Sequence, residues 1–540
     1  MSSILKYFIS YLFFSLFLST AFSQGLVTTS NLPFILINTN GQSISDSPKI
    51  IADMGIIWNG EGKTNNVKDL MNNYNGKIGI EIRGSSSQMF PKKSYGIETK
   101  SNDLLTTDFS LLGMPEENDW VLYAPYTDKT MIRDVLTYTL DAGLGHWSPR
   151  CRYVELFLNG NYEGVYVLME KIKRNKNRVD IAKLTTSDNV GNDLTGGYII
   201  KIDKTTGTSG AGWYSSYPNT SGNTYYQHDY PKPDVITSTQ RSYIKDYVKS
   251  MEMALYQDKF TGPGSYHDYL NDSSFVDFMI MNELAKNVDG YRLSSYLYKA
   301  KNNRLNCGPI WDFNLGYGNA DYFNGWSTYG FQYQSNLAQP NGQQDNWQNP
   351  FWWNKLMTDQ AYEKKLTQRW NSLRSKQLTS ERITFVIDSL VNLLSEAQVR
   401  NYQRWPILGQ KVWPNYYVGN TYISEINWMK DWITNRLYFL DHMWPDKTII
   451  IDDGSPQANK VFPNPFSDQL TIQFATDYNG SGTAEIFSTS GSLLRTYNIV
   501  LQDGKIQLGF SGKNNISRGL YVLRIIHYDR VLLTQKIMKR

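Results

Sequence analysis

Two aspartates, Asp289 and Asp312, flank a stretch that predicts a β-hairpin. The run Tyr296–Lys299 alternates in side-chain type and is followed by the turn formers Lys301–Arg304, which is the pattern of strand, turn and strand. Because a hairpin brings its ends together, both carboxylates can face one small volume. Phosphoryl transfer uses such a pair, one acid to orient a hydroxyl nucleophile and another to hold Mg²⁺ on the phosphates.

A structural role is the alternative for each aspartate. Most loop aspartates cap a turn or the end of a strand or helix. For Asp289 or Asp312 alone this interpretation is the simpler one, whereas two acids brought together by a hairpin favour a catalytic role.

A second group of residues suited to phosphate binding lies near the N-terminus. Residues 79–98 predict a strand, a small-residue loop that runs from Arg83 to Ser87, and a second strand. The loop can present backbone N–H groups, hydroxyls and a guanidinium to a phosphate, and Lys92 or Lys93 adds positive charge. It contains neither a P-loop nor a G-x-G-x-x-G pattern. An ordinary hairpin loop is the alternative.

Several ordered blocks resemble the CotH kinase family of atypical protein kinases. They are Arg83–Gln88 with Lys92–Tyr95, Leu111–Leu122, Tyr126–Arg133, Tyr153–Glu170, and Asn287-x-Asp289 with Trp311-Asp312-Phe313-Asn314. The resemblance covers residues 30–445. It implies an α+β chain with an atypical protein-kinase-like two-lobe fold, a β-rich N-lobe and a helical C-lobe, followed here by a small C-terminal β-sandwich.

The resemblance also implies ATP and Mg²⁺ as cofactors and gives individual residues a role. Asp289 resembles the catalytic base, and Asp312 with Asn314 resembles the metal ligands. The residues expected near the nucleotide are Arg83, Ser85, Ser86, Ser87, Lys92, Lys93 and Glu170. Glu170 is expected to fix the strand lysine, as the glutamate of a kinase Lys–Glu pair does; the alternative is an exposed glutamate at a strand end.

Two positions depart from the kinase pattern. Ser294 stands where a kinase-like site has an Asn for a second Mg²⁺, and Asn314 stands where the family often has a second acid. An amide oxygen can bind Mg²⁺ but brings no charge. The sequence therefore leaves open whether the protein is an active kinase.

Helices are expected to position these residues. The helix predicted over residues 275–286 delivers Asp289 from its C-terminal end, which gives a catalytic group the rigid support it needs. Another helix is expected from Asp128, a natural N-cap, and Asp119 is expected to be a structural carboxylate near Arg133. Further helices are predicted over residues 237–253, 351–357, 361–377, 380–396 and 423–442, and residues 205–222 predict a flexible surface loop.

The two ends of the chain carry export signals. Residues 1–23 combine Lys6, an apolar run from Tyr7 to Leu18 and the small-residue site Ala21-Phe22-Ser23, which indicates a signal peptide rather than a membrane anchor. We expect no transmembrane segment after its removal.

A polar linker, residues 446–459, precedes a last domain, residues 460–540, that predicts short strands and a small β-sandwich. Its blocks Phe462–Phe466, Arg518–Val522 and Gln535–Arg540 resemble the type IX secretion sorting domain, type A. The resemblance implies recognition by the type IX secretion machinery and export through the periplasm and outer membrane, so that the protein is secreted or held at the cell surface. A carbohydrate-binding sandwich is the alternative.

Composition narrows the remaining choices. A net charge of +4 over 540 residues gives no electrostatic case for nucleic acid. The five histidines are scattered and no G-x-S-x-G occurs, which argues against a hydrolase. The two cysteines, Cys151 and Cys307, leave a single disulfide open.

Two functional hypotheses follow. The first is an exported atypical protein kinase that transfers the γ-phosphate of ATP to Ser or Thr of a secreted or surface protein. The alternative is a catalytically inactive surface protein that keeps the fold to bind a partner protein or polysaccharide, a reading that the scarcity of ATP outside cells supports.

Overall fold

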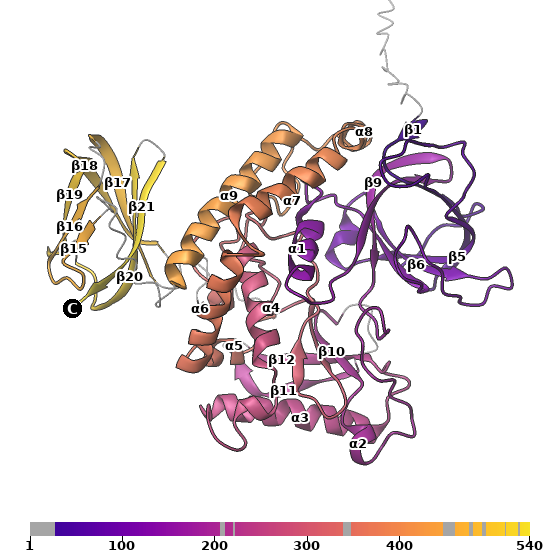
Figure 1. Cartoon of the computed structure of the whole chain (residues 1–540), viewed down its shortest axis with the longest axis horizontal. Coiled ribbons are helices and arrows are strands. Elements are labelled where there is room, and N and C mark those ends of the chain that lie inside the picture. The colour runs from indigo at the N-terminus through magenta and orange to yellow at the C-terminus, as the bar shows by residue number, and fades with distance from the viewer. Residues whose placement is uncertain are drawn as a thin grey trace, which may run out of the picture.

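The computed structural model describes residues 27–205, 211–219, 222–337, 347–445, 460–474, 479–488, 493–512, 515–527 and 530–540. The predicted signal peptide (1–23) and linker (446–459) lie outside the described residues. Figure 1 shows a β-rich N-terminal part, a helical middle and a C-terminal pair of β-sheets, which confirms the predicted α+β class.

The N-terminal part is a closed barrel with the strand order β2-β3-β5-β6-β7-β9-β8. The strands are β2 Phe34–Asn38, β3 Ile50–Ile57, β5 Tyr74–Arg83, β6 Ser94–Lys100, β7 Asp119–Tyr123, β8 Cys151–Leu158 and β9 Asn161–Glu170. Parallel pairing of β2 with β8 closes the ring, so the barrel has no free edge. Its alternating apolar side chains, among them Ile35, Met54 and Ile80, form a separate buried cluster. A short pair, β1 Thr29–Ser30 and β4 Asn65–Asn66, lies outside this ring.

The predicted hairpin over residues 153–170 is confirmed as β8 and β9. Its turn residues Asn159 and Gly160 both have positive φ, 51° and 78°, as a type I′ turn requires.

A second sheet has the order β11-β12-β10-β13-β14. Its strands are β10 Tyr198–Ile202, β11 Gly212–Asn219, β12 Gly222–Tyr230, β13 Ser295–Lys299 and β14 Leu305–Cys307. The hairpin predicted between the two aspartates is confirmed, with Leu297 opposite Cys307. The prediction of a loop over 205–222 is wrong for β11, because Trp213 of this strand is buried against Tyr226 of β12.

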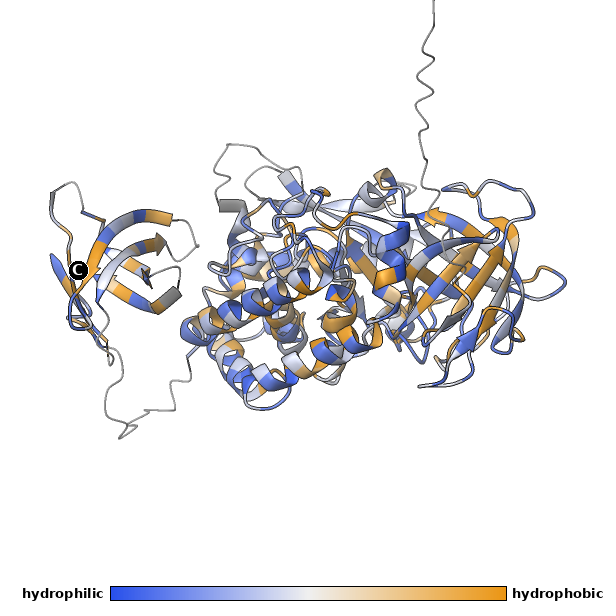
Figure 2. Cartoon of the chain, turned by 90° about the horizontal axis from the view of Figure 1, so that it is seen from above, coloured by the Kyte–Doolittle hydropathy of each residue, from blue (hydrophilic) through white to orange (hydrophobic). Residues whose placement is uncertain are grey.

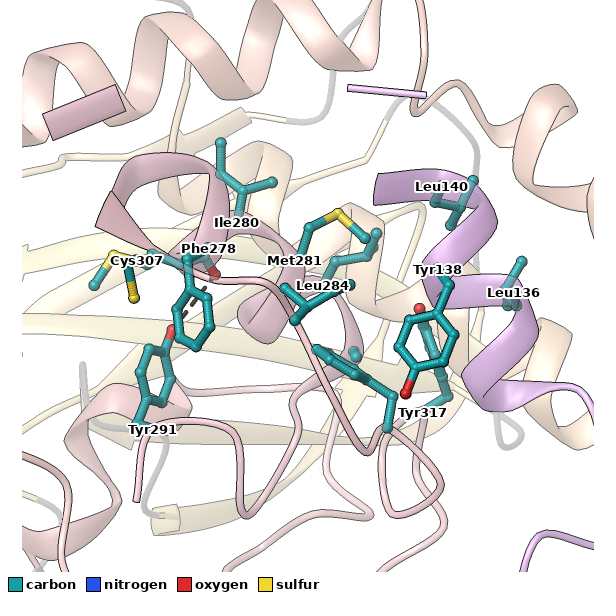
Figure 3. Close-up of a cluster of buried hydrophobic side chains, with 14 of the residues drawn as sticks. Leu136, Tyr138, Leu140, Phe278, Ile280, Met281, Leu284, Tyr291, Cys307 and Tyr317 are labelled. Atoms are coloured by element: carbon teal, nitrogen blue, oxygen red, sulfur yellow. Dashed lines mark hydrogen bonds between the residues drawn. The ribbon is translucent and has the colours of Figure 1, made fainter. Parts of the chain in front are cut away.

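The helical part surrounds a buried central helix, α4 Asp272–Ala285. Every residue of α4 from Ser274 to Ala285 is buried, which is expected of a helix packed on all sides. Figure 3 shows Phe278, Ile280, Met281 and Leu284 of α4 in one apolar cluster with Leu136 and Tyr138 of α1. The other helices are α1 Arg133–Ala142, α2 Gly191–Leu194, α3 Ser238–Tyr256, α5 Trp352–Leu356, α6 Gln360–Arg374, α7 Ser380–Leu393, α8 Ala397–Arg404 and α9 Tyr422–Met443.

Helix α1 begins later than predicted. The carboxylate of Asp128 accepts the backbone N–H groups of Thr130 and Arg133, at 3.0 and 2.9 Å, and also pairs with the Arg133 guanidinium. Asp128 therefore stabilises a turn before the helix, and Ile132 is the N-cap. The expected contact between Asp119 and Arg133 is not formed. Asp119 pairs with Lys173 at 2.9 Å, and Arg133 pairs with Asp128.

The C-terminal part consists of two sheets that share one apolar core, as the predicted sandwich requires. One sheet holds β15 Lys460–Phe462, β16 Gln469–Gln473 and β19 Lys505–Gly509; the other holds β18 Leu493–Leu501, β17 Gly480–Ser488, β20 Gly519–His527 and β21 Arg530–Lys539. Figure 2 shows this C-terminal part at one end of the molecule and the barrel at the other. It contacts the helical part where the Tyr329 hydroxyl lies 3.0 Å from that of Thr534.

Two further predictions can be compared with the described residues. None of the described helices is both long and apolar enough to cross a membrane. Cys151 and Cys307 are both free, so the structure does not form the disulfide that the sequence left open.

Candidate functional site

A cleft of about 940 Å³ brings together the two groups of residues that the sequence predicts to bind phosphate and to do chemistry. It lies where β5 of the barrel, β10 of the second sheet and the segments after α4 and β14 meet. The predicted site residues that line it are Arg83, Ser85, Ser86, Ser87, Asp289, Asp312 and Asn314. Segments more than two hundred residues apart in the chain thus share one cavity.

Asp289 is held at the end of the buried helix α4. The helix stops because Lys286 takes a left-handed conformation, with a φ of 45°, and the next turn presents the aspartate. The Arg292 guanidinium donates a 2.6 Å hydrogen bond to Asp289 Oδ1, and the Tyr322 hydroxyl donates a 3.5 Å bond to the same oxygen. The carboxylate is 17% exposed, so it is fixed yet reachable.

Asp312 is held by contacts to both neighbouring elements. Its carbonyl accepts a 3.0 Å hydrogen bond from the Asn287 amide, which ties it to the segment that carries Asp289. Its N–H donates to the Tyr138 hydroxyl of α1 at 3.0 Å. The φ of Asp312 is 63°, a conformation that non-glycine residues adopt at a cost and that concentrates at functional sites.

The electrostatic surroundings of Asp312 are those of an acid-rich cleft. Burial, together with the negative charges of Asp289 and Asp203, raises the pKa of Asp312 well above its usual range, while Arg83 and Lys204 act in the opposite direction. These carboxylates therefore lie close enough to repel one another. A positive ion or a positively charged ligand would relieve that repulsion.

The small-residue loop forms a further part of the lining of the cleft. Gly84 allows its tight turn, because it has a φ of 113° and a Cβ there would lie 2.0 Å from Ser87 Oγ. The Arg83 guanidinium lies over the Trp311 ring, 5.5 Å from its centroid. The loop thus presents hydroxyls and one fixed cation to the cavity.

Lys92, Lys93 and Glu170 do not line the cleft. Lys92 is buried, and its Nζ donates to the Val165 carbonyl at 2.6 Å and to Asn401 Oδ1 at 2.8 Å. Lys93 donates to the carbonyl of Gln88. The expected lysine–glutamate pair is absent among these described residues, because the closed barrel turns both lysines away from Glu170.

Glu170 is fully buried and bound to arginines instead. Both of its carboxylate oxygens accept 2.9 Å hydrogen bonds from Arg150, and Arg178 lies 3.6 Å away. Glu170 therefore neither pairs with Lys92 or Lys93, as expected, nor is exposed at the strand end, as in the alternative. It stabilises the end of β9.

Lys92→Met is a test of this structural role. We expect the free energy of unfolding to fall by about 1–3 kcal/mol, since the buried Val165 carbonyl loses its donor. Denaturant unfolding measures this loss. An unchanged free energy of unfolding would contradict the structural role.

The structure adds residues that sequence reasoning did not place in the site. Lys204 lines the cleft, and its Nζ donates a 2.7 Å hydrogen bond to Ser86 Oγ of the small-residue loop. Asp203 lines it too, because the antiparallel pairing of Ile202 with Ser295 sets the end of β10 beside the start of β13. The only signal in the sequence is that the run Tyr198–Ile202, which is rich in strand-forming residues, is followed by an acid, Asp203.

Asp134 of α1 is a further carboxylate of the cleft. It accepts a 2.6 Å hydrogen bond from the N–H of Phe313. Burial and the charge of Asp312 raise its pKa well above the usual range. Asp134 therefore positions the segment that carries Asp312.

The donor set fits Mg²⁺ that is also held by phosphates. Among the described residues, no group of three or more His, Cys, Asp or Glu side chains is arranged to hold a metal ion by itself. Asp312 and Asn314 offer carboxylate and amide oxygens in one cleft. Mg²⁺ is bound in this way, by one or two carboxylates together with substrate phosphates and water.

Comparisons with known proteins identify two regions of the chain. The family model described as CotH kinase protein matches residues 80–440, and that of the secretion system C-terminal sorting domain matches residues 460–540. A search of curated proteins found no match. The sorting domain indicates secretion to the outer surface by the type IX machinery. Since the first match spans more than half of the sequence, the chain belongs to the CotH kinase family.

Proposed function

We propose that this protein is an exported atypical protein kinase that transfers the γ-phosphate of ATP to Ser or Thr of a secreted or surface protein. One observation carries the proposal: the small-residue loop with Arg83 and the two aspartates Asp289 and Asp312 line one cleft. Membership of the CotH kinase family supports the use of ATP.

In this proposal Asp289 orients the acceptor hydroxyl and takes its proton. The hydroxyl oxygen attacks the γ-phosphorus, the bond from that phosphorus to the β–γ bridging oxygen breaks, and ADP leaves. Arg292 and Tyr322 both hold Oδ1 of Asp289, so we assign the proton to Oδ2. Positioning of this kind supplies much of the catalysis in phosphoryl transfer.

The phosphates are assigned to the small-residue loop and to Lys204. Arg83, the serine hydroxyls and Lys204 would bind their oxygens, and Lys204 takes the place that Lys92 or Lys93 held in the sequence hypothesis. Asp312 and Asn314 would hold Mg²⁺, which neutralises charge on the phosphates when it is bound.

The same proposal covers the domain organisation. The barrel and the helical middle, residues 30–445, would act as the two lobes of a kinase-like unit with the nucleotide between them. Residues 1–23 would be removed as a signal peptide, residues 446–459 would be a linker, and residues 460–540 would direct passage from the periplasm across the outer membrane.

The assignment of Lys204 gives a direct test. With γ-labelled ATP and Mg²⁺ we expect transfer to a Ser/Thr protein substrate such as casein, and Lys204→Met should raise the KM for ATP about tenfold through the loss of one charge-assisted contact. Lys245→Met, at an exposed position of α3, should leave it unchanged. Equal KM values for both variants would remove Lys204 from the phosphate site.

Two observations favour the alternative of an inactive partner-binding protein. Neither Lys92 nor Lys93 lines the cleft, and Ser294 stands in place of a metal-binding Asn. A thermal-shift titration distinguishes the active kinase from the inactive protein. ATP with Mg²⁺ raises the Tm if the cleft binds nucleotide, and leaves it unchanged under the alternative.

A further inference from the structure

A second cavity, of about 370 Å³, opens beside the cleft and is called the side pocket here. Arg83, Lys201, Tyr296 and Trp311 line both cavities. The stacked pair of Arg83 and Trp311 therefore forms a common wall. A substrate bound at the cleft can reach the side pocket without leaving the surface of the protein.

The side pocket is the cationic end of this double cavity. Its described lining holds Arg83, Lys171, Lys201 and Lys232 against a single acid, Asp229. In the main cleft, by contrast, the described lining holds four aspartates and also four cations, Arg83, Lys201, Lys204 and Arg292. The excess of positive charge is therefore confined to the side pocket.

The nearest acids satisfy these lysines only partly. The distances are 3.9 Å for Lys171–Asp119, 3.7 Å for Lys201–Asp203 and 3.7 Å for Lys232–Asp229, whereas strong charge-assisted hydrogen bonds measure about 2.7–2.9 Å. Burial lowers the pKa of Lys171, and the positive charges of Arg83 and Lys232 also lower it, while Asp119 and Asp229 act in the opposite direction. An anion among these groups would relieve their repulsion.

Two buried polar side chains on this wall each have one atom without a hydrogen-bond partner. Gln227 is 2% exposed and His228 is 6% exposed, and the atoms concerned are Gln227 Oε1 and His228 Nδ1. Buried polar atoms are normally satisfied, so orphans beside a cavity point to a ligand or water there. His228 can donate an N–H to an anion, whereas Gln227 Oε1 accepts only from a donor such as water. Burial and Arg241 lower the pKa of His228 to about 4, so a neutral ring remains that can donate one N–H.

We propose that the side pocket binds an anionic side chain of the acceptor protein, a carboxylate or a phosphorylated residue, close in sequence to the Ser or Thr that is modified. This inference rests on the proposed kinase function. A nucleotide fits the side pocket less well, because adenine and ribose are neutral and would leave its three lysines without an anion. Of the groups assigned to the phosphates and to Mg²⁺, Ser86, Lys204 and Asp312 line the cleft but not the side pocket, and Arg83 lines both.

The experiment uses three fluorescein-labelled peptides that share one acceptor serine and carry Glu, phosphoserine or Gln at the flanking positions. Fluorescence anisotropy measures their binding to the full protein, and transfer from ATP is measured in parallel. We expect Lys171→Gln/Lys232→Gln to weaken binding of the Glu or phosphoserine peptide, or both, about tenfold and to leave the Gln peptide unchanged. The peptide with the larger loss identifies the anion.

Two controls keep the test decisive. Lys245→Gln/Lys249→Gln removes two exposed lysines of α3 that lie outside both cavities and should bind all peptides as the wild type does. Lys232→Gln alone, at a side chain that is 60% exposed, keeps the fold and should weaken binding of the anionic peptide about threefold.

The outcomes separate this inference from the proposed function. Unchanged affinity of both anionic peptides for the Lys171 and Lys232 variants overturns the anion site, even if phosphate transfer occurs. A raised KM for ATP with unchanged peptide affinity overturns it as well and assigns the pocket to the nucleotide. If no peptide is phosphorylated but the expected pattern of peptide binding is observed, the anion site stands and the kinase function fails.

Discussion

Replacing Asp289 by asparagine will lower the kcat of phosphate transfer by about 10²–10⁴-fold, the range that a general base contributes. The amide keeps the shape of the side chain and can still accept the bond from Arg292, but it cannot take the proton of the acceptor hydroxyl. We expect ATP binding to persist, because the groups assigned to the phosphates are untouched. Initial rates and a nucleotide titration measure the two effects.

Asp321→Asn is the matched control for this variant. Asp321 follows the Asp312 segment, pairs with Lys411 at 3.0 Å and is 20% exposed, which is close to the 17% of Asp289. It does not line the cleft, so its loss should leave kcat unchanged. Equal rates for wild type and Asp289→Asn would end the assignment of the base, whatever the nucleotide titration shows.

Replacing Arg436 by methionine will lower the free energy of unfolding by about 3–5 kcal/mol, because a fully buried carboxylate loses its charge partner. Arg436 of α9 donates a 2.8 Å hydrogen bond to Glu283 Oε2, and both side chains are 0% exposed. Its other N–H groups bind the carbonyls of Glu283, Thr328 and Gly330. Chemical denaturation measures the loss.

Lys430→Met supplies the comparison on the same helix. Lys430 pairs with Asp388, but the two side chains are 29% and 57% exposed, and exposed pairs contribute about 0–1 kcal/mol. A small effect of both substitutions would show that the Glu283–Arg436 pair does not stabilise the packing of α9 against α4, the helix that precedes Asp289.

The part of the site that could be predicted depends on local pattern. The hairpin between Asp289 and Asp312 follows from alternation and turn residues that are neighbours in sequence, and its pairing is confirmed. Helix α4 could be predicted in the same way, although it starts three residues earlier than expected, at Asp272. Asn271 caps it, since its side chain accepts the N–H of Ser273.

The predictions that failed concern which charged groups meet. The Glu170–Arg150 pair is set by the register of the β8–β9 hairpin, where the Glu170 N–H donates to the Arg150 carbonyl. Nothing near Asp119 in the sequence favours Lys173 over Arg133. Lys204 reaches Ser86 only because the second sheet packs beside the barrel. The sequence shows which residues are charged, but it does not show which of them form ion pairs or hydrogen bonds with one another.

By itself the sequence determined the two aspartates and the hairpin between them, the small-residue loop, the hairpin of β8 and β9, and the C-terminal sorting domain. Only the tertiary structure decided that Lys204 rather than Lys92 or Lys93 lies at the cleft, and that Asp134 and Asp203 join the acids there. The physical reason is that barrel closure and sheet packing fix the direction of each charged side chain, and a buried charge is stable only where those long-range contacts supply a partner.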